Sequence, residues 1–524
     1  MDALGRQTGE SSPLGIYGKG YDAAGRLNLL VWPDNFYVNY DYNAIGNVTA
    51  IRENGATSGA GVLAQYSYDS LGRRTGIVRG NGNNTGIGYD TASRLQSIGH
   101  DFPGTANDVG WGYGYNPAGQ LKEAGRNNDA YAWGGHYNAA RTLGANGLNQ
   151  LTTQASVSGT TTTNSTFGYD LRGNLATSAT GVDMVQTTTY GYNSLNQLVS
   201  LLPPGAATAT SVGYDPIGRL SAITMPVNIK KRFSYIGGML ATEHDSIGTI
   251  LRRYVPGPGT DEPLVWYEGA GTADRRWLHA DERGSVVSVS DAGGNVIAIN
   301  RYDEYGVPAA TNLGRFQYTG QAWLPELGMY YYKARMYSPT LGRFMQTDPI
   351  GYGDGLNWYN YVGGDPVNAT DPTGLVCLTV GGCGPVPGGI DVNGRGHTDP
   401  CNWGSGCTSI GGDAWNAVLE RTPGVMGWRE VLESLATGLV DQAEKAKQYA
   451  KRCVAGTGSI SAGETARAGV RGAVRGAAQG GARALVLTGP EGVPVAAAGG
   501  ALTGMVTSSA TSAVKQACQA GNGG

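Results

Sequence analysis

The sequence predicts a mainly β protein: a spiralling antiparallel β-sheet of hairpin repeats, followed by a small, mostly α-helical tail. Three observations lead to this prediction. The chain has 86 Gly among 524 residues, 30 Tyr against 6 Phe and only 15% charged residues, a composition that suits short strands joined by tight turns. A Tyr-containing motif recurs through residues 1–300. After residue 375 that motif stops, and an Ala- and Gly-rich segment begins.

The recurring motif is Tyr-Asp/Asn-x-x-Gly-Arg/Asn/Gln-Leu/Val, and clear neighbouring copies stand 21 to 26 residues apart. Internal repeats of this length are typical of stacked architectures. A degenerate copy at 145–151 has Ala145 where the Tyr would stand. The clear copies begin at Tyr21, Tyr42, Tyr68, Tyr89, Tyr115, Tyr169, Tyr192 and Tyr214.

Each copy of the motif predicts one β-hairpin. The Tyr ends a strand, and the Asp or Asn together with the Gly forms the turn, because Asx side chains bond nearby backbone and Gly accepts a positive φ. The Leu or Val then opens the next strand. One hairpin cannot bury its face alone, so stacked neighbours bury it. We therefore expect a spiralling β-sheet with structural Tyr residues at its turns; separate small β-domains are the alternative.

The net charge of −3 gives no signal for nucleic-acid binding. No apolar run follows Met1, so no signal peptide is visible. The first residues, Met1-Asp2-Ala3-Leu4-Gly5-Arg6, instead match the second half of a repeat. This match predicts a chain that begins inside a repeat and that once followed further N-terminal parts, including those needed for delivery.

The segment 334–375 contains short motifs in a fixed order, with Arg335 13 residues before Asp348 and Asp371 23 residues after it. The motifs are Ala334-Arg335-Met336-Tyr337, Gly342-Arg343-Phe344, Asp348-Pro349 and Asp371-Pro372-Thr373-Gly374-Leu375. With the repeats, they resemble the RHS/YD-repeat family, the shell-forming part of bacterial polymorphic toxins and of the Tc toxin C component. The resemblance covers residues 1–375. It implies a repeat β-shell over 1–300, a core over 301–375 and a variable tail, the candidate toxin, over 376–524.

In that family the repeats form a hollow shell around the toxic segment, and the core is an aspartyl-type autoprotease that cuts after its DPxGL motif. The resemblance implies that Asp348 and Asp371 work as acid and base, that Arg335 orients them, and that one turnover cuts between Leu375 and Val376. No cofactor is implied. From spacing alone, the Asp-Pro steps are better explained as turn formers, because Pro restricts the preceding residue and Asp caps turns.

The predicted function is a toxin carrier. The shell encloses the chain's own C-terminal segment as cargo, the core releases it, and the protein is secreted or delivered at the cell surface against competing bacteria or a host. An immunity protein and a secretion-system component would be further partners. Two alternatives stay open: a cell-surface carbohydrate-binding or structural protein whose exposed Tyr and Trp stack on sugars, or an inactive fragment that aggregates through open strand edges.

The tail after Leu375 contains all six Cys residues, but the gaps in Cys377-x5-Cys383 and Cys401-x5-Cys407 are wider than usual for zinc, so no metal site is predicted. The favoured interpretation is a loosely packed helical tail, and a membrane-active tail is the alternative because small residues recur every four positions. Its amphipathic helix would present Trp428, Val431, Leu432, Leu435 and Leu439. The small residues are Gly472, Gly476 and Gly480.

Overall fold

The computed structural model describes residues 1–379, apart from 136–138 and 183–184, together with 486–488 and 494–496. The chain divides into two units, Met1–Val418 and Leu419–Gly524, and the fold below is that of the first. Of the second unit, the structure describes one antiparallel pair, β33 (Val486–Thr488) and β34 (Pro494–Ala496). The predicted amphipathic helix and the Cys residues after Cys377 lie outside the described residues. Within the described ranges, no helix has the length and hydropathy needed to cross a membrane.

Two large sheets contain most of the described residues, and in both the strands follow one another in chain order as antiparallel neighbours. This order confirms the predicted mainly β, antiparallel fold. The 11-stranded sheet consists of β1 (Gly9–Ser12), β2 (Gly15–Tyr21), β3 (Leu27–Val31), β4 (Tyr37–Tyr42), β5 (Val48–Glu53), β6 (Val62–Tyr68), β7 (Arg74–Arg79), β8 (Asn84–Tyr89), β9 (Leu95–Asp101), β10 (Val109–Tyr115) and β11 (Leu121–Arg126). The 15-stranded sheet consists of β12 (Ala139–Ala145), β13 (Leu151–Ser158), β14 (Thr161–Tyr169), β15 (Leu175–Gly181), β16 (Gln186–Tyr192), β17 (Leu198–Leu202), β18 (Thr210–Tyr214), β19 (Leu220–Thr224), β20 (Lys230–Ile236), β21 (Met239–His244), β22 (Ile250–Pro256), β23 (Pro263–Glu268), β24 (Arg275–Ala280), β25 (Val286–Ser290) and β26 (Val296–Ile299).

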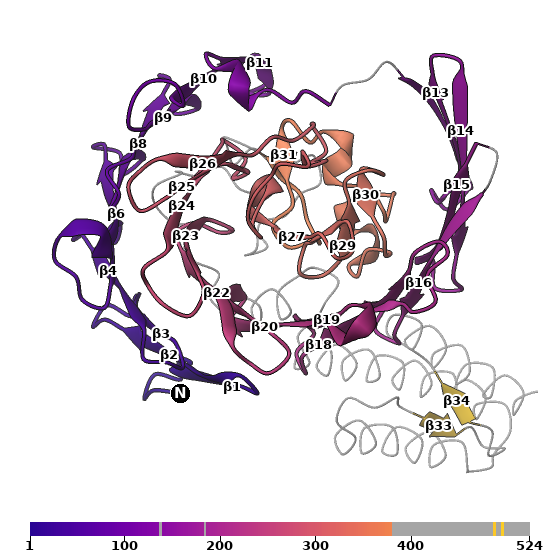
Figure 1. Cartoon of the computed structure of the whole chain (residues 1–524), viewed down its shortest axis with the longest axis horizontal. Coiled ribbons are helices and arrows are strands. Elements are labelled where there is room, and N and C mark those ends of the chain that lie inside the picture. The colour runs from indigo at the N-terminus through magenta and orange to yellow at the C-terminus, as the bar shows by residue number, and fades with distance from the viewer. Residues whose placement is uncertain (136–138, 183–184, 380–485, 489–493, 497–524) are drawn as a thin grey trace, which may run out of the picture. The chain divides into compact units, whose positions relative to one another are not determined.

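The second sheet ends inside the first, so the chain spirals inward. In Figure 1, β1–β11 form one curved wall, β12–β19 continue on the opposite side, and β20–β26 lie within the first wall. Buried Leu63 of the first sheet and buried Tyr267 and Trp277 of the second belong to one hydrophobic cluster. The Trp277 indole N–H donates to the Leu63 carbonyl at 2.9 Å. Apolar side chains of the two sheets thus bury one another, which a single hairpin could not do.

The repeat turns share one pattern of hydrogen bonds from the backbone to Asp or Asn, and copies with Asp and Arg add a side-chain contact, as the copy at Tyr21 illustrates. Asp22 Oδ1 accepts the backbone N–H groups of Ala24 and Arg26 at 2.9 Å, and its Oδ2 accepts Arg26 Nε at 2.7 Å. The Arg26 guanidinium carbon lies 4.4 Å from the ring centre of Tyr42, the Tyr of the next repeat. The Tyr42 hydroxyl donates to the Leu27 carbonyl at 2.7 Å. We call this arrangement the Asp–Arg–Tyr ladder.

The ladder connects one hairpin to the next. Guanidinium-over-ring contacts of 4.4 to 4.8 Å recur with Arg6, Arg26, Arg73, Arg94 and Arg219. A ring hydroxyl bonds a carbonyl of the preceding repeat at Tyr21, Tyr42, Tyr68, Tyr89, Tyr115, Tyr192 and Tyr214. Tyr169 lies edge-on to Tyr359, with ring centres 5.7 Å apart. Each repeat Tyr therefore ends a strand and faces a neighbour.

Residues 318–379 form a compact segment within the curve of the large sheets (Figure 1). Its inner apolar residues, such as Leu324 and Met336, share a hydrophobic cluster with Leu198 and Ile223 of the second sheet. The segment contains a four-stranded sheet of β27 (Ala322–Leu324), β28 (Met329–Tyr331), β29 (Met336–Ser338) and β30 (Arg343–Phe344), and the pair β31 (Ala369–Thr370) and β32 (Leu378–Thr379). The short 3₁₀ helices are η1 (Gly59–Gly61), η2 (Asp129–Tyr131), η3 (Pro226–Asn228), η4 (Tyr318–Gly320), η5 (Gly351–Asp354) and η6 (Val362–Gly364).

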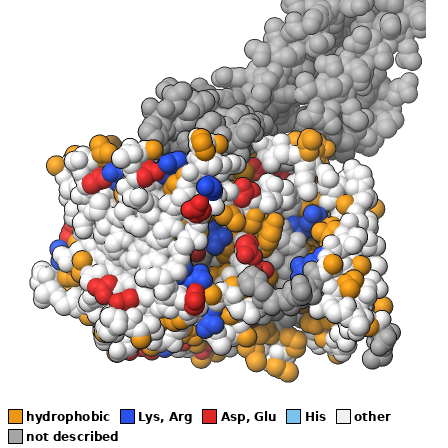
Figure 2. All heavy atoms as spheres, turned by 90° about the horizontal axis from the view of Figure 1, so that it is seen from above, with side chains coloured by type: hydrophobic (Ala, Val, Ile, Leu, Met, Phe, Trp, Pro, Cys, Tyr) orange, Lys and Arg blue, Asp and Glu red, His pale blue; other side chains and the backbone are white. Residues whose placement is uncertain are grey.

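Charge on the described surface is mixed. On the face shown in Figure 2, acidic and basic side chains lie beside one another and do not separate into patches of one sign. This arrangement fits the small net charge of −3.

Candidate active site

Three turns of the core segment bring Arg335, Asp348 and Asp371 together. Arg335 directly precedes β29, three residues separate Asp348 from the end of β30, and Asp371 directly follows β31. Their exposed fractions are 2%, 8% and 1%. Charged side chains are rarely this buried unless they are paired, so we expect these three side chains to interact with one another.

The Arg335 guanidinium lies between the two carboxylates. Its Nη2 is 2.9 Å from Asp348 Oδ2 and 3.7 Å from Asp371 Oδ2. Its Nε donates to the Gly374 carbonyl at 2.5 Å, and its guanidinium carbon lies 3.7 Å from the ring centre of Phe344. The planar cation is therefore fixed by a ring below it and by a carbonyl of the loop that follows Asp371.

The two oxygens of Asp371 have different surroundings. Oδ1 accepts the backbone N–H groups of Thr373, Gly374, Leu375 and Val376 at 2.8 to 3.3 Å. Oδ2 is buried and has no hydrogen-bond partner among the described residues. One oxygen thus shapes the loop, and the other is free to carry a proton or to bind water.

Burial raises the pKa of Asp348 and of Asp371 to about 6, and in both cases the charge of Arg335 acts in the opposite direction. Burial also lowers the pKa of Arg335, while Asp348 and Asp371 act to raise it. Near-neutral carboxyl pKa values allow one group to be protonated while the other is ionised, which acid–base chemistry on a peptide bond requires.

Comparison with known proteins finds similarity to repeat-containing toxins. A family model described as RHS Repeat matches residues 42–85. The chain is 29% identical over 365 residues to double-stranded DNA deaminase toxin A of Burkholderia cenocepacia, which covers 60% of this chain and 25% of that protein. The RHS repeat and this similarity confirm the resemblance to the RHS/YD-repeat family.

A second relative of this RHS-repeat protein is the tRNA3(Ser)-specific nuclease WapA of Bacillus spizizenii, 26% identical over 199 residues, which are 36% of this chain and 8% of that protein. The crystal structure of TcdB2-TccC3-Cdc42 shares the fold with a TM-score of 0.50 at 20% identity, over 69% of this chain and 22% of that one. The chain therefore spans a quarter or less of the length of these proteins.

The candidate scissile bond of the RHS-repeat protein, Leu375–Val376, lies in the loop that Asp371 shapes. Leu375 is buried, and the Val376 N–H lies 3.3 Å from Asp371 Oδ1. Beyond the loop, β32 pairs with β31, with Ala369 opposite Thr379. Both sides of the bond are therefore held against the core.

A third carboxylate, Asp354, also belongs to this site, although the sequence analysis did not identify it. It ends η5, and its Oδ1 lies 3.3 Å from the N–H of Cys377. Burial raises the pKa of Asp354, and the charge of Asp354 acts to raise the pKa values of Asp348 and Asp371. Burial and Asp354 together raise the pKa of the Cys377 thiol to about 12.

A further Asp-Pro step in the same segment, Asp365-Pro366, has different surroundings from the two at the site. The Asp365 side chain is exposed and accepts hydrogen bonds from Asn368. Asp365 is therefore an ordinary turn former, whereas Asp348 and Asp371 face a buried cation. Among the described residues, no group of three His, Cys, Asp or Glu side chains is placed to hold a metal ion.

Proposed function

We propose that this RHS-repeat protein is a toxin carrier that cuts its own chain between Leu375 and Val376. The observation that carries the proposal is the buried group of Arg335, Asp348 and Asp371, in which Asp371 also contacts the amide nitrogen of Val376 at 3.3 Å. A turn-forming role alone explains neither two raised carboxyl pKa values nor a guanidinium at 2% exposure.

The reaction needs one ionised and one protonated carboxyl group. The ionised carboxylate takes a proton from water, and the oxygen attacks the carbonyl carbon of Leu375 while the protonated carboxyl donates to the carbonyl oxygen. Collapse of the tetrahedral intermediate breaks the carbon–nitrogen bond. The carboxyl group that took a proton from water gives it to the leaving nitrogen, and the other carboxyl group recovers its proton from a hydroxyl of the intermediate. The products are a carboxylic acid at Leu375 and an amine at Val376, and both carboxyl groups of the site return to their starting protonation states. Because the chain is its own substrate, each molecule reacts once.

The carrier role extends to the whole chain. We propose a shell over 1–300, a core over 301–375 and a cargo over 376–524, with delivery outside the producing cell, an immunity protein and a secretion-system component as partners. The inward spiral of β20–β26 and the toxins among the relatives support this role. The nucleic-acid activities in the relatives' names belong to those proteins, and the cargo's own activity is a separate question.

The test is the intact mass of the expressed full-length chain beside Asp348→Asn and Asp371→Asn. We expect the parent to break into 1–375 and 376–524, and both variants to stay whole. Asp365→Asn is the matched control: it removes a carboxylate from another Asp-Pro step of the same segment, where the side chain is exposed, and it should cleave like the parent. An intact parent would contradict self-cleavage.

The carbohydrate-binding alternative predicts an uncleaved chain that binds glycans saturably through exposed aromatic rings. Among the described residues, Tyr352 is the aromatic residue with a largely exposed side chain, and four of the eight repeat Tyr rings face Arg side chains of the ladder. An intact parent would direct the next experiments to this alternative and to the inactive fragment.

A further inference from the structure

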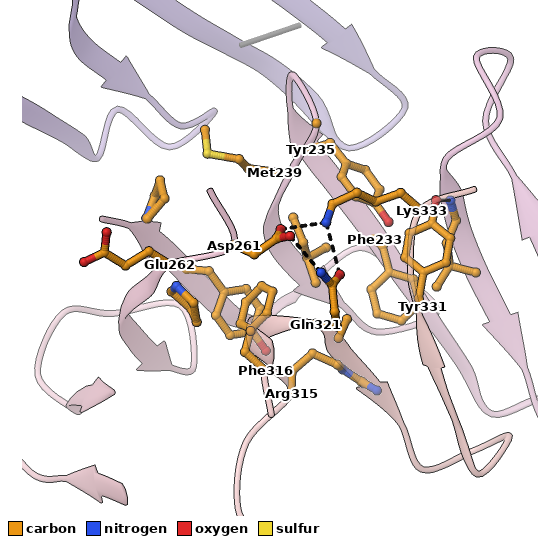
Figure 3. Close-up of a pocket in the computed structure, with 18 of the residues that line it drawn as sticks. Phe233, Tyr235, Met239, Asp261, Glu262, Arg315, Phe316, Gln321, Tyr331 and Lys333 are labelled. Atoms are coloured by element: carbon orange, nitrogen blue, oxygen red, sulfur yellow. Dashed lines mark hydrogen bonds and ion pairs between the residues drawn. The ribbon is translucent and has the colours of Figure 1, made fainter. Parts of the chain in front are cut away.

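Asp261, Gln321 and Lys333 form a partly buried polar cluster beside the candidate active site (Figure 3). Gln321 and Lys333 both donate to the carbonyl of Pro372. Lys333 Nζ donates to Asp261 Oδ1 at 2.6 Å, to Gln321 Oε1 at 3.0 Å and to the Pro372 carbonyl at 2.5 Å. Gln321 Nε2 donates to Asp261 Oδ2 at 2.7 Å and to the same Pro372 carbonyl at 3.3 Å. We call these three side chains the Pro372 clamp.

The clamp joins the shell to the loop that contains the candidate scissile bond. Asp261 lies between β22 and β23 of the 15-stranded sheet, Gln321 directly precedes β27, and Lys333 lies between β28 and β29. Pro372 directly follows Asp371 in sequence. A side chain from the shell therefore helps to fix the peptide group next to a predicted catalytic carboxylate.

The turn that carries Lys333 also aligns the loop residue by residue. Lys333 donates to the carbonyl of Pro372, the Ala334 N–H donates to the carbonyl of Thr373 at 3.1 Å, and Arg335 donates to the carbonyl of Gly374 at 2.5 Å. Three consecutive donors thus meet three consecutive acceptors. A slip of the loop by one residue would break all three contacts and would move a different peptide bond towards Asp371.

The backbone around the clamp is strained, which is unusual away from functional sites. Lys333 has φ +63° and Asp261 has φ +52°, both in the left-handed region. A Cβ on Gly320 would lie 2.0 Å from the Asp261 carbonyl oxygen, and one on Gly374 would lie 2.6 Å from the Tyr332 carbonyl oxygen. At these close approaches, the loop between β22 and β23, the turn that contains Lys333 and the loop 372–376 pack against one another.

We propose that Lys333, fixed by Asp261 and Gln321, is a positioning residue that sets the register of the loop 372–376 and so selects the bond that is cut. The inference rests on the proposed self-cleavage. It adds that the shell takes part in the reaction through Asp261. Since misplacement by about 1 Å can cost about 100-fold in rate, loss of the clamp should be visible in kinetics.

The first test measures cleavage after pulse-labelled cell-free synthesis of the full chain. We expect Lys333→Met to slow cleavage about 10- to 100-fold, Lys333→Arg to recover most of the rate, and Asp261→Asn to have a smaller effect. The control is Asp274→Asn, which breaks a surface ion pair with Arg276 on the next hairpin of the same sheet and should leave the rate unchanged. A positioning role also predicts a lower maximum rate with the same pH of maximum rate.

The second test does not require cleavage. In the Asp348→Asn background, hydrogen exchange reports on the N–H groups of residues 373–376 that Asp371 accepts. Lys333→Met should speed their exchange at least tenfold while the strands of the large sheets keep their protection. An unchanged exchange rate would refute the positioning role of Lys333. Cleavage of Lys333→Met at the rate of the parent would refute it as well. Faster exchange in a chain whose parent never cleaves would support the clamp and contradict self-cleavage.

Discussion

The strongest prediction concerns the pH dependence of self-cleavage. If Asp348 and Asp371 work as a pair, the reactive form has one proton shared between the two carboxyl groups. Burial raises both pKa values to about 6, so this form should be most populated near pH 6. For two groups of equal pKa, its population falls about 25-fold when the pH moves about two units in either direction.

The assay follows the cleaved fraction over time after cell-free synthesis, with the chase performed in buffers from about pH 4 to about pH 8 and the fold checked by circular dichroism. We expect a bell-shaped rate profile with its maximum near pH 6. Asp354→Asn removes a charge that acts to raise both pKa values, so its profile should shift to lower pH. A rate that rises steadily to pH 8, or one that does not change with pH, would refute the two-carboxyl reasoning.

Three further results are expected. In the uncleaved Asp348→Asn chain, the pKa of Asp371 is raised, so the folded state keeps the Asp371 proton above about pH 4, where the unfolded state loses it. The free energy of unfolding should therefore fall by about 2 to 3 kcal/mol from pH 4 to pH 7. Urea unfolding measures this change, with Asp348→Asn/Asp371→Asn as the reference. Arg335→Met should abolish cleavage and, because it leaves buried carboxylates without their cation, lower the free energy of unfolding at neutral pH by about 3 to 5 kcal/mol, an effect that should shrink near pH 4. Arg94→Met removes an Asp–Arg–Tyr ladder contact 4.7 Å from the Tyr115 ring and should lower stability by about 1 kcal/mol without changing the cleavage rate; a cost above about 3 kcal/mol would show that the ladder carries more than local contacts.

The hairpins could be predicted from the sequence because their turns are local. An Asp or Asn at the first turn position and a Gly three residues later close the turn through backbone contacts within five residues, as at Asp22 and Gly25. The copy at Ala145 lacks its Tyr, but it still places a strand end at Ala145 and a strand start at Leu151. The stacking of each Arg on the next Tyr joins residues about 15 to 21 positions apart, and the motif alone does not define that geometry.

Some residues of the candidate active site could likewise be predicted from the sequence, and others could not. Arg335, Asp348 and Asp371 were predicted by resemblance, and the structure brings them together. Asp354 has no motif of its own and joins the site through the fold of η5. Lys333 stands two residues before Arg335, but its partner Asp261 lies 72 residues earlier in the sequence, so only the tertiary structure connects them.

The regular turns have a consequence for how the repeats can vary in length. Through β19, the repeat turns on the edge that carries the Asp–Arg–Tyr ladder all contain five residues between strands. Within each sheet, the connections at the opposite ends of the strands range from two residues after β1 and β13 to eight after β5. Residues inserted at a ladder turn would separate an Arg from the Tyr of the next hairpin. Residues inserted at the opposite edge extend only a surface loop, which proteins tolerate well. The unequal spacing of the repeats, 21 to 26 residues, therefore arises on one edge of the wall, where the chain can gain or lose residues while the ladder on the other edge keeps its geometry.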